Sequence, residues 1–106
     1  MKVGDYLNVP YRVESEAYET ADGSWIRRVR HPELPGAAAE SPVIEDALTQ
    51  LERRRIEVIL GLLRSGRQPP VPRPPLAHNV TGATLERIGL PGLASLLDRD
   101  AADLRE

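Results

Sequence analysis

Apolar and polar residues alternate in the first part of the chain, as they do in a strand with one buried face. The alternation covers residues 5–20, and the Asp22-Gly23 pair that follows is typical of a tight hairpin turn. Residues 25–31 (WIRRVRH) then predict the returning strand. Because successive side chains on a strand point to opposite faces, Arg28 and Arg30 share one face, which predicts an antiparallel hairpin with a basic side.

A proline corner ends this hairpin. Pro32 and Pro35 have no backbone N–H to give to a neighbouring strand, and Gly36 permits the turn that follows them. Residues 37–40 (AAAE) can then form a short third strand, although alanine favours strands only weakly. The sequence therefore predicts three antiparallel strands.

A long amphipathic helix is predicted next. Ser41 can cap its first N–H groups, Pro42 suits the first helical position, and Gly66 is placed to end the helix in a left-handed conformation. Apolar residues cover nearly all sides of its second half, more than one sheet face can bury. The excess predicts a homo-oligomer (dimer or tetramer), or else a C-terminal segment that folds back over the helix. The predicted interface consists of Ile56, Leu60 and Leu63.

The last third of the chain changes composition twice. Residues 69–75 contain five prolines and predict a stiff, extended strap. Residues 76–106 then contain short helical patterns interrupted by glycines and a proline. We interpret residues 1–75 as one domain and residues 76–106 as a helical tail. The apolar residues of the tail need a surface to lie on, either that of a partner protein or that of the chain itself.

Composition limits the possible functions. The 106 residues carry 14 basic and 16 acidic side chains, so no overall positive charge attracts the chain to nucleic acid or to an anionic membrane. There is no cysteine, and His31 and His78 lack the spacing of metal ligands. No apolar run approaches membrane length, and the first residues lack the hydrophobic core of a secretion signal. We expect a cytoplasmic protein without metal or cofactor.

The order of these motifs resembles that of the HicB-type antitoxins of bacterial type II toxin–antitoxin systems. That family is similar in having a tyrosine-bearing strand, an Asp-Gly turn followed by an aromatic residue, a strand ending in Pro-acid-Leu-Pro-Gly, and a helix that opens with an acidic pair. The corresponding residues here are Tyr11, Asp22, Gly23, Trp25, Pro32, Glu33, Leu34, Pro35, Gly36, Glu45 and Asp46. The resemblance covers residues 11–72.

The resemblance implies an α+β fold of the order β-β-β-α-β, a partial ribonuclease-H-like sheet packed on one long helix, here with short C-terminal helices. It also implies a non-catalytic antitoxin that binds and neutralises a small basic toxin, a HicA-like mRNA interferase. Antitoxins of this family commonly end in a helix-turn-helix or ribbon-helix-helix DNA-binding segment. The acidic tail of this chain shows neither pattern, which disfavours DNA binding.

Candidate toxin-binding residues follow from charge. An acidic antitoxin can mask a basic RNA-binding face by charge complementarity, and acids of the first strand and of the tail are available for this, together with two apolar tail residues. These candidates are Glu14, Glu16, Glu19, Leu93, Leu97, Asp98, Asp100 and Asp103. The alternative interpretation of the acids is ordinary solvated surface.

Other functions remain open. Ribonuclease-H chemistry needs clustered carboxylates to hold two metal ions, and the acids of this chain are explained as turn, corner and helix-start residues, so we expect no enzyme. The chain could be an orphan HicB-like scaffold that only dimerises. It could also be a nucleic-acid-binding transcriptional autoregulator that uses Arg27, Arg28, Arg30 and residues 53–55. The helical pairs Glu52–Arg55 and Arg53–Glu57 predict a structural role for two of these arginines.

Overall fold

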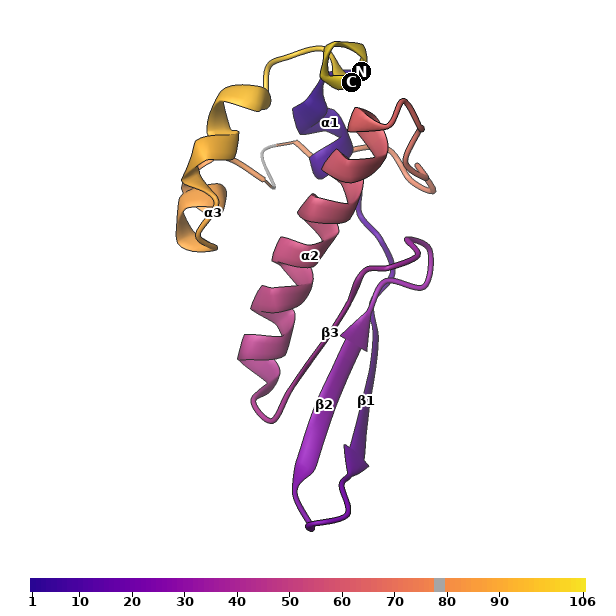
Figure 1. The fold of residues 1–106 in the computed structure, drawn as a ribbon, viewed down its shortest axis with the longest axis vertical. Helices are drawn as coiled ribbons and strands as arrows, with labels where there is room; N and C mark the ends of the chain where they lie inside the picture. Colours follow the sequence, from indigo (N-terminus) through magenta and orange to yellow (C-terminus); the bar gives the residue numbers. More distant parts are fainter. Residues whose placement is uncertain (78–79) are drawn as a thin grey trace.

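The chain forms a three-stranded sheet with one long helix against it, and short helices lie on the far side of that helix (Figure 1). The computed structural model describes residues 1–77 and 80–106. In chain order the elements are α1 (Val3–Leu7), β1 (Glu14–Glu19), β2 (Trp25–Arg30), β3 (Ala38–Ser41), α2 (Ile44–Arg64), α3 (Gly82–Arg87) and the 3-10 helices η1 (Pro91–Leu96) and η2 (Ala101–Leu104). The predicted α+β class is confirmed.

The sheet has the order β1-β2-β3, and both neighbouring pairs are antiparallel. The predicted turn is present: the Asp22 carboxylate accepts the N–H of Ser24 at 3.0 Å, and Gly23 has a φ of 87°. The strand predicted over residues 5–20 is too long. Its first residues belong to α1, and an irregular segment separates α1 from β1.

The proline corner joins β2 to β3 through a buried leucine. Leu34 is fully buried, and its N–H donates to the carbonyl of His31 at 3.0 Å, while the N–H of Ala37 donates to the carbonyl of Leu34 at 3.1 Å. Gly36 has a φ of 92°, a conformation that residues with a Cβ rarely adopt. The corner thus returns the chain into β3, as the sequence predicts.

Helix α2 begins later than predicted. Ser41 remains in the sheet, where it pairs with Arg27, and its hydroxyl accepts the N–H of Val43 at 3.2 Å. Val43 is therefore the N-cap residue, without a side-chain cap, and Ile44 is the first helical residue. Ser41 and Pro42 do not have the predicted capping roles, because pairing with β2 holds the chain extended up to Ser41.

The C-terminal end of α2 agrees with the prediction. Gly66 has a φ of 74°, and the N–H groups of Gly66 and Arg67 donate to the carbonyls of Leu63 and Leu62 at 3.1 and 2.9 Å. This pair of bonds is the Schellman motif, which requires a residue that tolerates the left-handed conformation.

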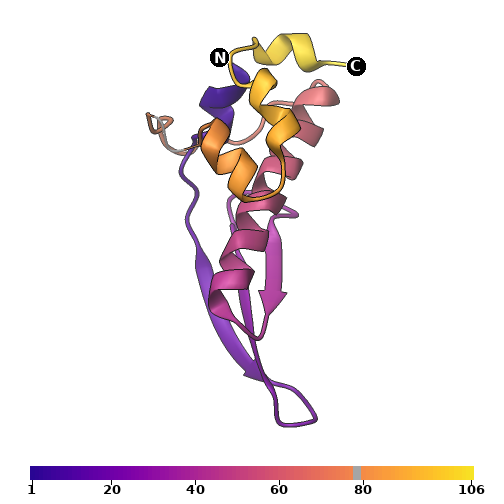
Figure 2. The same cartoon turned by 90° about the vertical axis from the view of Figure 1, so that its left-hand side faces the viewer.

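The chain itself covers the apolar second half of α2. Ile56, Leu60 and Leu63 are at most 6% exposed, so the excess of exposed apolar surface that predicted an interface is absent. Strands β2 and β3 cover one side of the helix, and α1 and η2 contact it elsewhere. Two perpendicular views place α3 and η1 on the side of α2 opposite to the sheet (Figures 1 and 2). Of the two alternatives, the folded-back C-terminal segment is the one observed.

The N-terminal helix is held by the C-terminal tail. The N–H groups of Val3 and Gly4 donate to the carbonyls of Arg99 and Leu97 at 2.8 and 2.9 Å, and the N–H of Ala101 donates to the carbonyl of Met1 at 3.0 Å. The first N–H groups of a helix have no partner within it, so α1 obtains partners from the tail. This long-range pairing explains why local alternation mispredicts a strand here.

The proline strap packs along the chain without forming a strand. The hydroxyl of Tyr11 donates to the carbonyl of Pro70 at 2.6 Å, the N–H of Leu76 donates to the carbonyl of Asn8 at 2.8 Å, and Pro69 is fully buried. The strand expected after the helix is absent from the described part of the chain. Five prolines within residues 69–75 remove the N–H donors that such a strand would need.

We predict that the tail is essential for stability, because Leu85, which is fully buried, belongs to the same core as the residues of α2. Leu85→Ala should lower the free energy of unfolding by about 2–5 kcal/mol, measured by urea denaturation. Leu76→Ala, at an exposed position, should change it by no more than about 0.5 kcal/mol. Equal effects of the two changes would show that the tail is not part of the core.

The corner glycine provides a second prediction. A Cβ at Gly36 would lie 3.7 Å from Val58, an ordinary contact, so the strain of Gly36→Ala comes from its backbone angle alone. We expect a loss of about 1–2 kcal/mol in the free energy of unfolding. Gly61→Ala, in the middle of α2 and with open space around its Cβ, should increase stability by up to about 1 kcal/mol. A stable Gly36→Ala variant would contradict the prediction.

Candidate partner-binding surface

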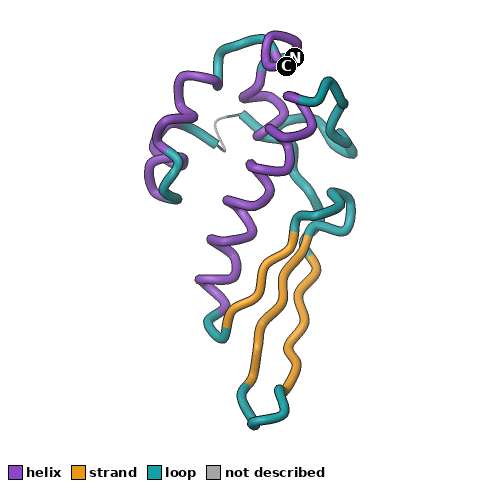
Figure 3. Tube along the Cα trace, in the orientation of Figure 1, coloured by secondary structure: helices purple, strands orange, loops and turns teal. Residues whose placement is uncertain are grey.

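The end of the β1–β2 hairpin extends beyond the rest of the sheet. The last β2–β3 pair is Arg27 with Ser41, whereas β1 and β2 remain paired as far as Glu19 with Trp25. The hairpin end is therefore a two-stranded ribbon that projects past the start of α2 (Figure 3). Trp25 lies on this ribbon and is 57% exposed. An exposed tryptophan on a projecting element is a typical anchor for a partner.

The outer face of the sheet carries an ordered set of ion pairs, which we call the charge ladder: Glu14, Glu16, Arg28, Arg30 and Glu40. Glu14 lies opposite Arg30, with 2.7 Å between carboxylate and guanidinium. Arg28 lies between Glu16 and Glu40, at 3.3 and 2.5 Å. The prediction that this side of the hairpin is basic is therefore wrong, because three glutamates neutralise its two arginines.

Tyr18 adds to the charge ladder. Its hydroxyl donates to Glu40 at 2.9 Å, and the guanidinium carbon of Arg28 lies 5.3 Å from the centre of its ring. The hydrogen bond from Arg28 holds the pKa of Glu40 below its ordinary value, and the hydrogen bond from Arg30 does the same for Glu14. These carboxylates are thus ionised and already paired, which makes Glu14 and Glu16 weaker candidates for binding a basic partner than the sequence suggested.

Unpaired acids lie on the hairpin and at the start of α2. Glu19, Glu45 and Asp46 form no ion pair within the described residues. Asp22 stays ionised, since hydrogen bonds from Thr20 and from the backbone of Ser24 lower its pKa. Exposed apolar side chains accompany them at the start of α2, namely Val43 and Leu48. The hairpin end therefore combines an exposed tryptophan with a local excess of negative charge.

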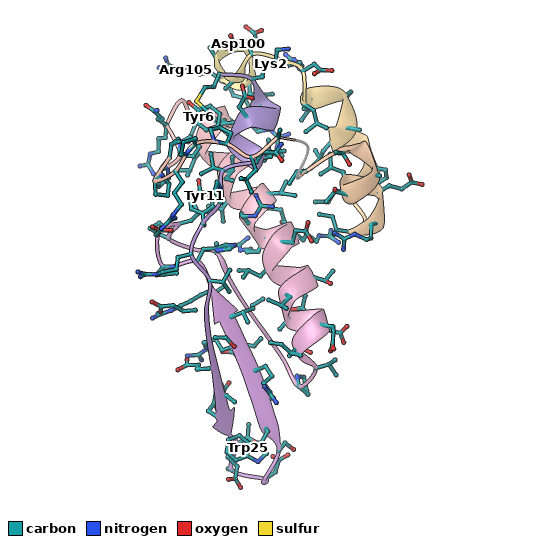
Figure 4. All side chains as sticks on the ribbon, turned by 180° about the vertical axis from the view of Figure 1, so that it is seen from behind. Lys2, Tyr6, Tyr11, Trp25, Asp100 and Arg105 are labelled. Atoms are coloured by element: carbon teal, nitrogen blue, oxygen red, sulfur yellow. The ribbon has the colours of Figure 1, made fainter. Side chains whose placement is uncertain are left out.

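The tail candidates lie at the other end of the molecule. Figure 4 places Asp100 at one end of the long axis and Trp25 at the other, and the molecule extends 48 Å along that axis. Leu93 and Leu97 are half-buried against the chain's own core. The Asp100 carboxylate accepts the N–H of Ala102 at 2.9 Å and so caps η2.

The candidates of the sequence analysis thus form two separate groups. Asp98 and Asp103 are exposed and lie with Asp100 in the tail, whereas Glu14, Glu16 and Glu19 belong to the hairpin. Of the two surfaces that the sequence analysis left open for the tail, the chain itself is the one observed, because the apolar residues of the tail pack on the chain's own core.

Most of the arginines proposed to contact nucleic acid are engaged within the chain. Arg53 pairs with Glu57 at 3.5 Å, as predicted, and Arg54 donates to the carbonyl of Gly36 at 3.2 Å. Arg55 does not pair with Glu52. Its guanidinium is buried and donates to the carbonyl of Leu7 at 2.6 Å.

Glu52 instead receives Arg87 of α3 at 3.0 Å. Arg28 and Arg30 belong to the charge ladder. Of the six arginines proposed to contact nucleic acid, only Arg27 has no polar partner in the described part of the chain.

A polar cluster ties the corner to its neighbours. The Glu33 carboxylate accepts the N–H of Arg12 and pairs with Arg73 of the strap, both at 2.7 Å. His31 is buried, with its Nδ1 3.1 Å from the carbonyl of Arg12 and its ring centre 5.7 Å from that of Tyr11. The sequence analysis missed this cluster because its members lie up to 61 positions apart (Arg12 to Arg73).

The described residues contain no group of three His, Cys, Asp or Glu side chains that could hold a metal ion. His78 lies outside the described residues. Asp22 belongs to the hairpin turn, and Glu33 belongs to the corner cluster. Among the described helices, none has the length and apolar character needed to cross a membrane.

The buried histidine predicts a dependence of stability on pH. Burial lowers the pKa of His31 below its ordinary value of 6.5. The hydrogen bond that the ring donates to the Arg12 carbonyl opposes this shift, and the charge of Arg55 adds to it. Because the unfolded state then binds the proton more readily, the free energy of unfolding should fall as the pH drops from about 6.5 towards the folded-state pKa.

His31→Gln should flatten this part of the pH profile, measured by urea denaturation between about pH 7.5 and 5. The steeper loss below pH 4.5, where the paired carboxylates titrate, should remain. An unchanged slope between about pH 6.5 and 5 in the variant would contradict the assignment to His31.

Comparisons of the chain with protein-family models, with curated proteins and with solved structures give no match.

Proposed function

We propose that the protein is a non-catalytic, HicB-like antitoxin of the cytoplasm, which binds a small basic toxin through the end of its β1–β2 hairpin. The proposal joins the motif order described above to the geometry of the hairpin. Three antiparallel strands, a proline corner and a long helix occur in the order that the resemblance implies. A partial ribonuclease-H-like arrangement is part of the proposal, without the final strand.

The observation that carries the proposal is the uncovered ribbon. Core burial does not require the hairpin to continue beyond Arg27, because β3 and α2 provide no cover there. An isolated two-stranded hairpin gains little stability from itself. The chain nevertheless places Trp25, its single tryptophan, on this ribbon and leaves it exposed. Binding a partner gives such a residue a role that folding does not.

The charge of the hairpin end indicates the chemistry of the partner. Arg28 and Arg30 form ion pairs within the charge ladder. The unpaired charged groups near Trp25 are therefore mainly carboxylates, including Glu19 and Asp22. A basic surface with an apolar pocket is complementary to this arrangement. An mRNA interferase has a basic face because it must bind RNA phosphates, which fits the proposed toxin class.

The alternatives receive less support. A nucleic-acid-binding role would need free cations, and five of its six proposed arginines are engaged in the fold. A dimerising scaffold that uses Ile56, Leu60 and Leu63 would need the tail to leave α2, since the tail lies in the same core as these residues. Self-association through another surface remains compatible with the antitoxin proposal.

Co-expression tests the proposed function. The chain is expressed with the product of the neighbouring reading frame, and growth rescue and co-purification are measured. We expect a short basic toxin whose growth arrest the parent chain relieves. Trp25→Ala and Glu19→Arg should each reduce co-purification at least about tenfold without lowering the melting temperature, as expected for an exposed anchor and a charge reversal.

Matched controls lie away from the hairpin. Leu76→Ala removes an exposed apolar side chain, and Glu86→Arg reverses an exposed charge on α3. Both variants should rescue growth like the parent. Full rescue by Trp25→Ala and Glu19→Arg would exclude the hairpin end as the binding surface, and a neighbourhood without a toxic basic protein would favour the scaffold.

A further inference from the structure

A cavity lies at the end of the molecule opposite to the hairpin. It has a volume of about 410 Å³ and lies where α1, the C-terminal end of α2 and η2 meet. Its lining includes Tyr6, Leu63, Arg67, Gln68, Asp100 and Arg105. Figure 4 shows Tyr6, Asp100 and Arg105 together at this end. The volume is within the range of sites for small organic ligands.

The buried tyrosine of this cavity has an unused hydroxyl. Tyr6 and Tyr11 are both 8% exposed. The Tyr11 hydroxyl donates to the carbonyl of Pro70, whereas the Tyr6 hydroxyl has no hydrogen-bond partner among the described residues. No side-chain polar atom of the described residues is both buried and unpaired, so the Tyr6 hydroxyl is open to the cavity. A ligand in the cavity would replace water as its hydrogen-bond partner.

Two arginines at the cavity also lack ionic partners. The side chains of Arg67 and Arg105 take part in no ion pair or hydrogen bond within the described residues, in contrast to the arginines of the charge ladder. The exposed Arg105 side chain lies against Gly66, since a Cβ placed on Gly66 would lie only 2.7 Å from its Nε. Gly66 therefore leaves room for this guanidinium beside the end of α2.

We propose that this cavity binds a small organic oxyanion, a phosphate or carboxylate attached to an apolar body. The two guanidiniums would bind the anionic group, which matches their planar donor geometry, and the Tyr6 hydroxyl would donate a further hydrogen bond. Leu63 and Ala101 provide an apolar wall for the body of the ligand. Asp100, the one carboxylate of the lining, caps η2 through Ala102 and leaves an excess of positive charge.

The arginines also have a simpler role, the compensation of the carbonyl groups at the end of α2. Compensation of these carbonyl groups would explain the positive charge of the arginines. It would not explain the cavity or the Tyr6 hydroxyl that faces it. The site is independent of the proposed antitoxin function, because the hairpin lies at the other end of the molecule.

Titration calorimetry and thermal unfolding of the full chain test the proposal with phenyl phosphate and benzoate, which share a ring and differ in the anionic group. Benzyl alcohol is the uncharged comparison. We expect at least one anion, at up to about 10 mM, to raise the melting temperature, and benzyl alcohol to have no effect. The preferred anion identifies the ligand as a phosphate or a carboxylate.

Variants separate a specific site from general screening of charge. Arg67→Gln and Arg105→Gln should each weaken binding by about tenfold, whereas Arg27→Gln at the hairpin should leave it unchanged. Tyr6→Phe should weaken binding several-fold yet retain the ligand-free melting temperature, while Tyr11→Phe should lower that temperature. No binding of either anion, or equal binding by the parent and both cavity arginine variants, would overturn the proposal.

Discussion

The need to cover the second half of α2 on more than one side shapes the whole chain. The sheet covers the side that faces β2 and β3, and the remaining apolar residues, such as Ile56 and Leu63, need other elements. Burial of a side chain of this size contributes about 1.5–3 kcal/mol, a large share of the stability of a small domain. The strap, α1 and the tail are therefore parts of one core, and no separate tail domain is needed to explain their sequences.

This arrangement makes several weak elements depend on one another. A helix of five residues such as α1 is not stable alone, and 3-10 helices are short and weak. Each is fixed because Val3 and Gly4 donate to tail carbonyls while Ala101 donates to Met1. The two chain ends consequently order together, and the cavity beside Tyr6 exists only when both are in place.

The predictable parts of the fold are those that local chemistry determines. Gly23, Gly36 and Gly66 each have a positive φ angle, which residues with a Cβ rarely adopt. The turn, the corner and the helix end can therefore be predicted from the positions of these glycines in the sequence. The position of α1 and the burial of Arg55 depend on partners more than 45 positions away, for which the sequence carries no local signal. The pairing of Glu14 with Arg30 could have been predicted from the sequence, because a turn at Asp22-Gly23 fixes the strand register and hence which charged residues face each other.

The proposed recognition surface and the packed core occupy different ends of the molecule for the same physical reason. Where β3 and α2 cover the hairpin, Val29 is fully buried, and the residues facing α2 must pack in the core. Beyond the Arg27–Ser41 pair, the hairpin residues no longer need to fill the core. The charges are divided in the same way. In the charge ladder the arginines of the outer face pair with glutamates, so the unpaired carboxylates near Trp25 contribute most to the electrostatic potential at the hairpin end. A basic partner that docks there encounters more unpaired carboxylates than unpaired cations, since Glu19 and Asp22 outnumber Arg27, and it does not compete with the packing that keeps α2 covered.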